Sequence, residues 1–268
     1  PDFSFTGHCE DENIMFTNNS SGIVSGYLWN FDDGQNSTDT SPIHTFSDQS
    51  VYNVILTASN AAGCNNTHTK SITVYSKPQV NFHSLQPPFS CSDTPTQFMD
   101  LTPNPNDSNL SSWQWNFGDA GSSQNTSVLK NPQHVYDDAG DYDVSLTVFT
   151  NFLCSSTLQL PTAISQAPVA DFNYSASCED VPVNFSDASS GDIDSWDWEI
   201  GSSFYSLQNP THTFINAGNT NAMLTVTATN DCIGSVSKPI VVPAKLAPDF
   251  TVSKNCTNQQ TLFTDISN

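Results

Sequence analysis

The side chains best suited to chemistry in this sequence are histidines, acidic residues and cysteines that recur at fixed spacings. A Pro-x-His-x-aromatic segment occurs three times and places His44, His134 and His212 at equivalent positions. An imidazole can act as a general base or bind a metal ion. No carboxylate pair or nucleophile keeps a fixed spacing to these histidines. We therefore expect structural imidazoles that hydrogen-bond to a neighbouring turn.

Acidic turns follow the first two of three aromatic segments. Asp32 and Asp33 lie in the first turn and Asp119 in the second, whereas the third reads WEIGSS and has no turn acid. Carboxylate oxygens are the ligands that Ca²⁺ prefers. The sequence favours solvated turns and leaves a calcium site open as the alternative. No other cofactor is expected.

The seven cysteines follow the same period. Three pairs can be assigned to equivalent positions, and the pairing predicted from them is Cys9 with Cys64, Cys91 with Cys154, and Cys178 with Cys232. The partner of Cys256 would lie beyond residue 268. No CxxC spacing supports a metal site, so disulfides are the favoured interpretation. Because disulfides persist in oxidising surroundings, we expect an extracellular or cell-surface protein.

An internal repeat explains these spacings. Each unit opens with a proline, an alternating segment and a cysteine, and a phenylalanine always follows seven residues after that cysteine. Later in each unit, a leucine stands twelve residues after the histidine and a cysteine eight residues after the leucine. The predicted boundaries are 1–76, 77–166 and 167–246 for three repeats, and 247–268 for the start of a fourth.

The elements that must position these residues are short β-strands. Apolar and polar residues alternate in runs of five to eight, and Gly, Pro, Asn, Asp and Ser separate the runs. About seven such strands in a unit are typical of a two-sheet antiparallel sandwich. The fold class is therefore all-β. The side chains predicted to fill the cores are Phe16, Trp29, Leu56, Phe98, Trp115, Leu146, Phe185, Trp198 and Leu224.

Charge excludes several functions. The chain has 27 acidic residues and six basic ones, all of them lysine, which gives a formal charge of −21. Nucleic-acid binding needs Lys and Arg to displace counterions, so it is excluded, and an anionic membrane would repel the chain. No apolar run is long enough for membrane insertion. Motifs of the common enzyme classes are absent from the sequence, so we expect no enzyme.

The segments WNFDDG at 29–34 and WNFGDAG at 115–121 resemble the WxFGDG strand and turn of the PKD (polycystic kidney disease) domain. The stretch from Asn131 to Val148 resembles the other half of that domain. The resemblance implies tandem immunoglobulin-like, PKD-type antiparallel β-sandwiches arranged as beads on a string. Thr220 departs from the pattern, because Tyr52 and Tyr142 stand at the equivalent positions.

The cysteine-containing subtype is similar to repeats of large secreted Bacteroidota surface proteins, including a giant gliding-motility adhesin exported by type IX secretion. The resemblance implies a non-catalytic stalk whose partners are neighbouring repeats of the same chain. Short proline-containing linkers agree with a stalk. Lateral self-association and a polysaccharide surface are further candidate partners. The alternatives are polysaccharide-binding modules on a secreted hydrolase and a cell-envelope lattice protein.

Two surface features complete the predictions. Trp113 and Trp196 share a face with the core tryptophans, and a core role nearer the sheet edge is the favoured interpretation. A platform on which a sugar stacks is the alternative. Asn-x-Ser/Thr sequons are mildly in excess of chance, which leaves glycan attachment open. The sequons considered are those at Asn18, Asn36, Asn65 and Asn125.

Overall fold

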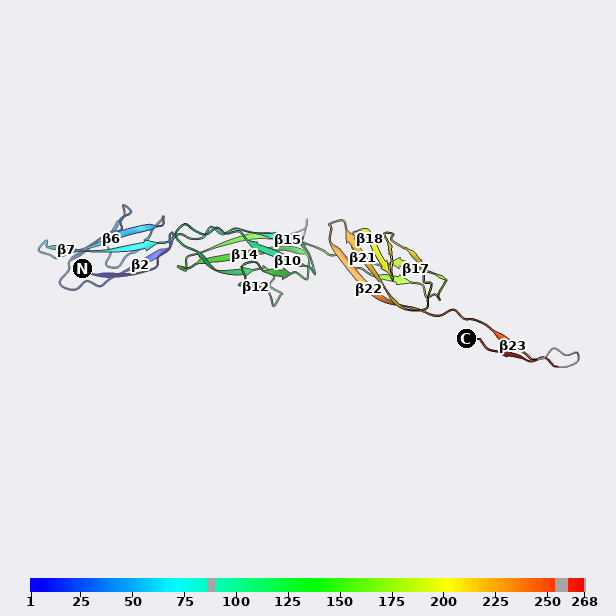
Figure 1. Ribbon diagram of the computed structural model, residues 1–268. Coiled ribbons are helices and arrows are strands. Elements are labelled where there is room, and N and C mark those ends of the chain that lie inside the picture. Colours follow the sequence, from blue (N-terminus) through cyan, green and yellow to red (C-terminus); the bar gives the residue numbers. More distant parts are fainter. Residues whose placement is uncertain (86–89, 254–259, 268) are drawn as a thin grey trace. The chain divides into compact units, whose positions relative to one another are not determined.

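A computed structural model describes residues 1–85, 90–253 and 260–267, and every regular element in that part of the chain is a β-strand (Figure 1). No helix there is long and apolar enough to cross a membrane. The chain divides into two compact units. The first holds repeat 1 and most of repeat 2. The second holds repeat 3, the described C-terminal residues, and residues 90–94, 136–140 and 164–166 of repeat 2.

Repeat 1 is a sandwich of two antiparallel sheets. One sheet has the strand order β1-β2-β5 and the other the order β4-β3-β6-β7. Its long hairpin, β6 and β7, follows the alternation of small and β-branched side chains in VYNVILTAS and HTKSITV. The strands are β1 (Phe3–Thr6), β2 (Asn13–Asn18), β3 (Gly26–Asn30), β4 (Asn36–Ser37), β5 (Ile43–Thr45), β6 (Ser50–Ser59) and β7 (Asn65–Val74).

Repeat 2 has the same two layers and one extra short strand. Its sheets have the orders β13-β10-β8 and β12-β11-β14-β15-β9, and β9 is parallel to β15. The strands are β8 (Phe82–Leu85), β9 (Ser90–Cys91), β10 (Pro95–Asp100), β11 (Leu110–Asn116), β12 (Thr126–Ser127), β13 (Gln133–Val135), β14 (Gly140–Thr150) and β15 (Ser155–Ser165).

Repeat 3 repeats the plan of repeat 1, with sheets β16-β17-β20 and β19-β18-β21-β22. The C-terminal segment contributes the two-stranded sheet β23-β24. The strands are β16 (Phe172–Tyr174), β17 (Pro182–Asp187), β18 (Ile193–Ile200), β19 (Ser203–Tyr205), β20 (Thr211–Thr213), β21 (Gly218–Ala228), β22 (Ile233–Val242), β23 (Phe250–Val252) and β24 (Phe263–Asp265).

The same tryptophan–leucine pair lies at the centre of each sandwich. The tryptophan lies on β3, β11 or β18, depending on the repeat. It is directly opposite the leucine that stands twelve residues after the histidine. All nine side chains predicted for the cores are at most 2% exposed. The alternating pattern therefore marks the inward faces. The cross-strand pairs are Trp29 with Leu56, Trp115 with Leu146, and Trp198 with Leu224.

Candidate functional site at the repeat junctions

The disulfides join neighbouring repeats. Cys9 of repeat 1 is bonded to Cys154 of repeat 2, and Cys91 of repeat 2 is bonded to Cys232 of repeat 3. The predicted pairing within each repeat (9–64, 91–154, 178–232) is therefore wrong. Cys64 and Cys178 are free thiols in the structure, and Cys256 lies outside the described residues. We call the cysteine near the start of each repeat its first cysteine and the one before its last long strand its second cysteine. Each disulfide joins the first cysteine of one repeat to the second cysteine of the next repeat.

The length of the last strand explains why the predicted pairs do not form. Cys9 forms a parallel β-bridge with Tyr75, directly after the end of β7. Cys64 stands directly before β7 begins. A ten-residue strand separates the two ends, which is about 33 Å at 3.3 Å per residue. A disulfide needs Cα atoms within roughly 7 Å, so Cys9 and Cys64 lie at opposite poles of one sandwich.

Repeat 3 has the same arrangement. Glu179 N–H, next to Cys178, donates to Pro243 O just beyond the end of β22, whereas Cys232 directly precedes the start of that strand. The first cysteine of a repeat thus lies at the pole where the chain leaves. The second lies at the pole where the chain enters and faces the first cysteine of the repeat before it.

At the first junction, polar and aromatic contacts surround the disulfide. The rings of Tyr75 and Phe152 stack with centroids 3.7 Å apart, and the His8 ring bonds to the Phe152 carbonyl. Ser76 N–H donates to a carboxylate oxygen of Asp107 at 2.9 Å. Cys9 and Cys154 are 5% and 0% exposed. This shielding protects the bond from reductants in solution.

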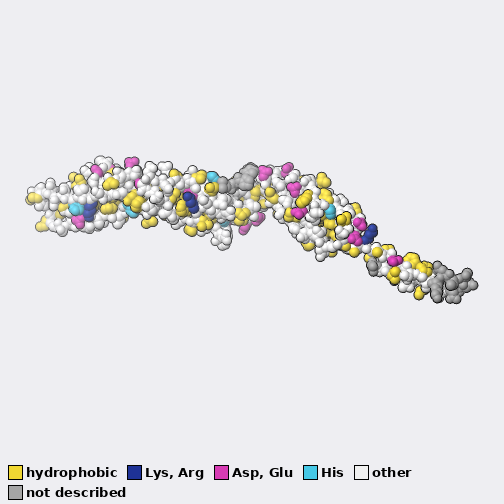
Figure 2. All heavy atoms as spheres, viewed as in Figure 1, with side chains coloured by type: hydrophobic (Ala, Val, Ile, Leu, Met, Phe, Trp, Pro, Cys, Tyr) yellow, Lys and Arg dark blue, Asp and Glu magenta, His cyan; other side chains and the backbone are white. Residues whose placement is uncertain are grey.

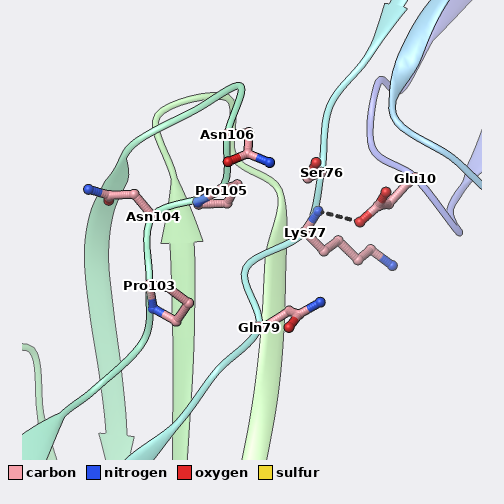
Figure 3. A pocket seen from close by; sticks show the side chains of 8 residues that line it. All are labelled: Glu10, Ser76, Lys77, Gln79, Pro103, Asn104, Pro105 and Asn106. Carbon is pink, nitrogen blue, oxygen red and sulfur yellow. Dashed lines mark hydrogen bonds between the residues drawn. The ribbon is translucent and has the colours of Figure 1, made fainter.

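A polar hollow of about 350 Å³ lies beside this junction (Figure 3). Glu10 points into it and accepts the Lys77 backbone N–H at 2.9 Å. The opposite wall is the loop from Pro103 to Asn106. The wall groups are the amides of Gln79, Asn104 and Asn106, two prolines, the Ser76 hydroxyl, and the charged side chains of Glu10 and Lys77. This lining offers no nucleophile and base in contact.

The second junction is packed more tightly around its disulfide. Cys91, Ala167 and Cys232 form one buried cluster. Asn230 donates from its side chain to Gln166 O, and a Cβ built on Gly234 would lie 2.1 Å from Pro168 O. Only glycine therefore allows the incoming linker to lie against the start of β22.

One linker hydrogen bond is common to the three repeats. In repeats 1 and 3 the backbone N–H of Lys77 and Lys245 donates to the carboxylate of Glu10 and Glu179, respectively. In repeat 2 the N–H of Ala167 donates to the Ser92 hydroxyl. The acceptor always directly follows the first cysteine, so the residue next to that cysteine holds the outgoing linker.

The repeat histidines are bound to the turns that follow the aromatic strands. His44 Nε2 lies 2.6 Å from Asp33 Oδ2, and His134 Nε2 lies 3.0 Å from Asp119 Oδ2. Each imidazole stacks on the phenylalanine of its own aromatic strand. The histidines therefore tie the turn to the core, as the sequence indicated.

Repeat 3 replaces the missing acid with a phenol. Tyr205 Oη lies 2.8 Å from His212 Nδ1. Burial lowers the pKa of His212, which favours the neutral ring. A neutral ring nitrogen can accept the Tyr205 hydroxyl, so this repeat keeps the tie without a carboxylate.

The candidate calcium residues are used within their own repeats. Asp33 and Asp119 pair with histidines, and Asp32 accepts the Asn53 N–H at 2.9 Å. In the part of the chain that the structure describes, one group of three metal-ligating side chains comes together, His8 with Cys9 and Cys154. Its two sulfur atoms form the disulfide, so they are not available to a metal ion.

The turn after each aromatic strand needs a left-handed residue, and Asp32, Gly118 and Gly201 supply it with φ of 68°, 75° and 62°. A Cβ at Gly118 would lie 2.7 Å from Asp143 O, whereas at Gly201 its nearest contact is 3.6 Å away. We expect Gly201→Ala to lower the free energy of unfolding by about 1–2 kcal/mol. Gly118→Ala is expected to lower it by roughly 3 kcal/mol or more, because it adds a backbone clash. Urea unfolding measures both, and equal losses would contradict the clash.

The outer tryptophans Trp113 and Trp196 are partly buried. Their indole N–H groups donate to Asp100 and Asp187 at 2.8 Å. Burial opposes ionisation of Asp187, but hydrogen bonds, including the one from Trp196, outweigh it and hold the pKa of Asp187 below its ordinary value. The indoles are thus fixed by carboxylates.

The sequons differ in accessibility. The side-chain nitrogen of Asn18, the atom that would carry a glycan, is buried without a hydrogen-bond partner. Asn125 is partly buried and its amide oxygen accepts the Asp119 N–H, whereas Asn36 and Asn65 are exposed.

Figure 2 shows acidic side chains scattered over the face in view and few lysines among them.

Comparison with known proteins agrees with this architecture. Residues 7–74, 77–159 and 165–242 each match the PKD domain. The collagenase ColA of Bacillus cereus is 35% identical over 75 residues, which are 26% of this chain and only 8% of the collagenase.

Two solved structures are similar to the chain at low sequence identity. The fibronectin(III)-like modules of Clostridium thermocellum CbhA share 13% identity at a TM-score of 0.36, covering 62% of this chain and 95% of theirs. The three N-terminal domains of the bacteriophage RB49 outer capsid protein Hoc share 10% identity at a TM-score of 0.35, covering 91% and 99%. The three family matches span most of the sequence, and the chain belongs to the PKD domain family.

Proposed function

We propose that this chain is a non-catalytic structural segment of an extracellular protein, a spacer whose consecutive PKD repeats are stapled covalently. The observation that carries the proposal is the pair of disulfides, each of which joins one repeat to the next. A spacer must keep its repeats connected and restrict bending between them. A disulfide beside a hydrogen-bonded linker does both.

The polar side chains that recur among the repeats support a structural role. The histidine of each repeat hydrogen-bonds to its own turn or strand, and the outer tryptophans bond to carboxylates. Disulfides support an oxidising, extracellular setting. In its finer form the proposal is a stalk in a cell-surface adhesin, which agrees with the tandem copies and short linkers.

A second candidate function is a module that binds polymer for a secreted hydrolase. The match to part of a collagenase favours it. The partly exposed Trp113 and Trp196 would be the stacking groups, since aromatic faces bind sugars and other flat apolar surfaces. Their bonds to Asp100 and Asp187 leave part of each ring exposed to solvent.

The test is binding of the purified 268-residue chain to collagen fibrils and to soluble and insoluble polysaccharides, with calcium and with chelator. A spacer is expected to show no saturable binding. Saturable binding that Trp113→Ala or Trp196→Ala abolishes, while the matched surface variant Phe204→Ala keeps it, would overturn the spacer and support the binding module. Phe204 is 75% exposed and lies outside both indole sites.

A further inference from the structure

We infer that the two free thiols, Cys64 and Cys178, are junction cysteines. Cys178 forms a disulfide with the second cysteine of a PKD repeat that follows it. Cys64 forms a disulfide with the first cysteine of a PKD repeat that precedes it. The partner at both poles is thus another repeat of the same kind. The inference deepens the proposed function, on which it rests, by naming what binds to each pole.

The first argument is the geometry at Cys178. In each repeat an aspartate two residues after the first cysteine has a positive φ, between 51° and 61°. Its N–H donates to the aromatic residue of the histidine segment at 2.8–2.9 Å. Cys178 is therefore held by the same turn as the bonded Cys9 and Cys91. These aspartates are Asp11, Asp93 and Asp180, and their acceptors are the carbonyls of Phe46, Tyr136 and Phe214.

The linker adds an independent observation at the same pole. Glu179 accepts the Lys245 N–H, as Glu10 accepts the Lys77 N–H beside the first disulfide. The outgoing chain of repeat 3 is thereby held against the residue next to Cys178. At the first junction that arrangement places the following repeat with Cys154 in bonding distance of Cys9. The exit pole of repeat 3 has the same arrangement.

The geometry at Cys64 matches that of the bonded second cysteines. In each repeat the carbonyl of the second cysteine accepts an N–H from the residue four positions earlier, at 2.8–3.0 Å. The residue directly before the cysteine has a positive φ, 83° at Gly63, 64° at Leu153 and 61° at Asp231. One hairpin turn thus presents Cys64 in the way that Cys154 and Cys232 are presented.

Exposure distinguishes the two situations. Cys154 and Cys232 are 0% exposed because the preceding repeat covers them, whereas Cys64 is exposed and Ile23 beside it is 94% exposed. Cys64 and the apolar side chain beside it form an exposed surface. At the other two junctions the preceding repeat covers the equivalent surface, and its first cysteine bonds to the second cysteine there. The occupant that fits is therefore a PKD repeat, because two such repeats already occupy the equivalent surface.

Bond formation requires an oxidant of the disulfide class, such as oxidised glutathione. The thiolate of one cysteine attacks the oxidant and forms a mixed disulfide, releasing one thiol. The thiolate of the second cysteine then attacks the protein sulfur and releases the other. The two cysteines lose two electrons and two protons, and the oxidant becomes two thiols.

The test uses a tandem chain in which residues 1–247 are followed by residues 1–268. The join reproduces the natural sequence, because Pro248, Asp249 and Phe250 repeat Pro1, Asp2 and Phe3. After refolding with oxidised glutathione and alkylation of free thiols, peptide mass mapping without reduction locates the bonds. We expect a peptide pair in which Cys178 is bonded to Cys64, together with alkylated forms of the remaining Cys64 and Cys178.

The control is Cys178→Ser in the first copy, which should remove the Cys178–Cys64 peptide pair while 9–154 and 91–232 persist. Absence of the Cys178–Cys64 peptide pair from the unmodified tandem chain, its persistence in the control, or a bond from Cys64 to Cys9 would overturn the inference. The proposed function fails by a different result, saturable binding to a polymer, so the two failures are distinguishable.

Discussion

Cleavage of the chain between repeats 1 and 2 is expected to release no fragment until the disulfides are reduced. Cys9 lies before the linker and Cys154 after it, so the bond holds both sides together. A protease recognition sequence inserted after Gln79, which is exposed, makes the cut specific. On non-reducing gels essentially all cleaved protein should migrate as one species, and reducing gels should show two fragments.

Two variants give this experiment its controls. Cys9→Ser removes the bridge, so the fragments should separate without reductant. Cys64→Ser removes a thiol that is free in the structure and should leave the result unchanged. Separation of the fragments of the unsubstituted protein without reductant would contradict the structure, because bonds within repeats release the N-terminal fragment. Closing a loop of this length contributes about 5 kcal/mol to stability in the chain-entropy model.

Replacement of the inner tryptophan of repeat 3 is expected to have the largest effect of any single side-chain change there. Trp198 is 1% exposed, packs edge-on against Phe172 at 5.1 Å and donates its indole N–H to Leu207 O. Trp198→Ala removes that packing and leaves a cavity, which costs about 3–5 kcal/mol. One transition in calorimetry should move to lower temperature while those of the other repeats remain.

The matched control is Trp196→Ala, two residues away on the same face of β18. Trp196 is only partly buried, and its loss deprives Asp187 of one of several donors. We expect a cost of about 1–3 kcal/mol, the range for a hydrogen bond to a charged group with some packing. A loss from Trp198→Ala below that from Trp196→Ala would contradict the assignment of inner and outer rings.

The side of the strand to which each histidine points could be predicted, because it follows from the alternation of side chains along one strand. His44 lies two residues from Pro42 and from Phe46, so its side chain points to the core side and reaches the turn that carries Asp33. The pairing of Tyr205 with His212 could not be predicted in the same way. Tyr205 lies on β19 in one sheet and His212 on β20 in the other, so the contact exists only once the two sheets have packed together.

The sequence by itself determined the repeat, the strands and the core. Alternation with a period of two is a local property, so the faces of Trp29, Trp115 and Trp198 can be assigned before any contact is known. The spacing from the histidine to Leu56, Leu146 and Leu224 is twelve residues in every repeat. The spacing from the tryptophan varies, and the structure places each leucine opposite its tryptophan on a strand that does not follow it directly in sequence.

Only the tertiary structure decided which cysteines are bonded. Pairing within a repeat and pairing with the next repeat both join one first cysteine to one second cysteine, so spacing cannot distinguish them. The distinction arises because Cys9 lies beside the end of β7 and Cys64 before its start, about 33 Å apart along the strand. The length of the run NNTHTKSITV gives the distance between the two ends of β7. Only the bridge from Cys9 to Tyr75 shows which of those ends lies beside Cys9.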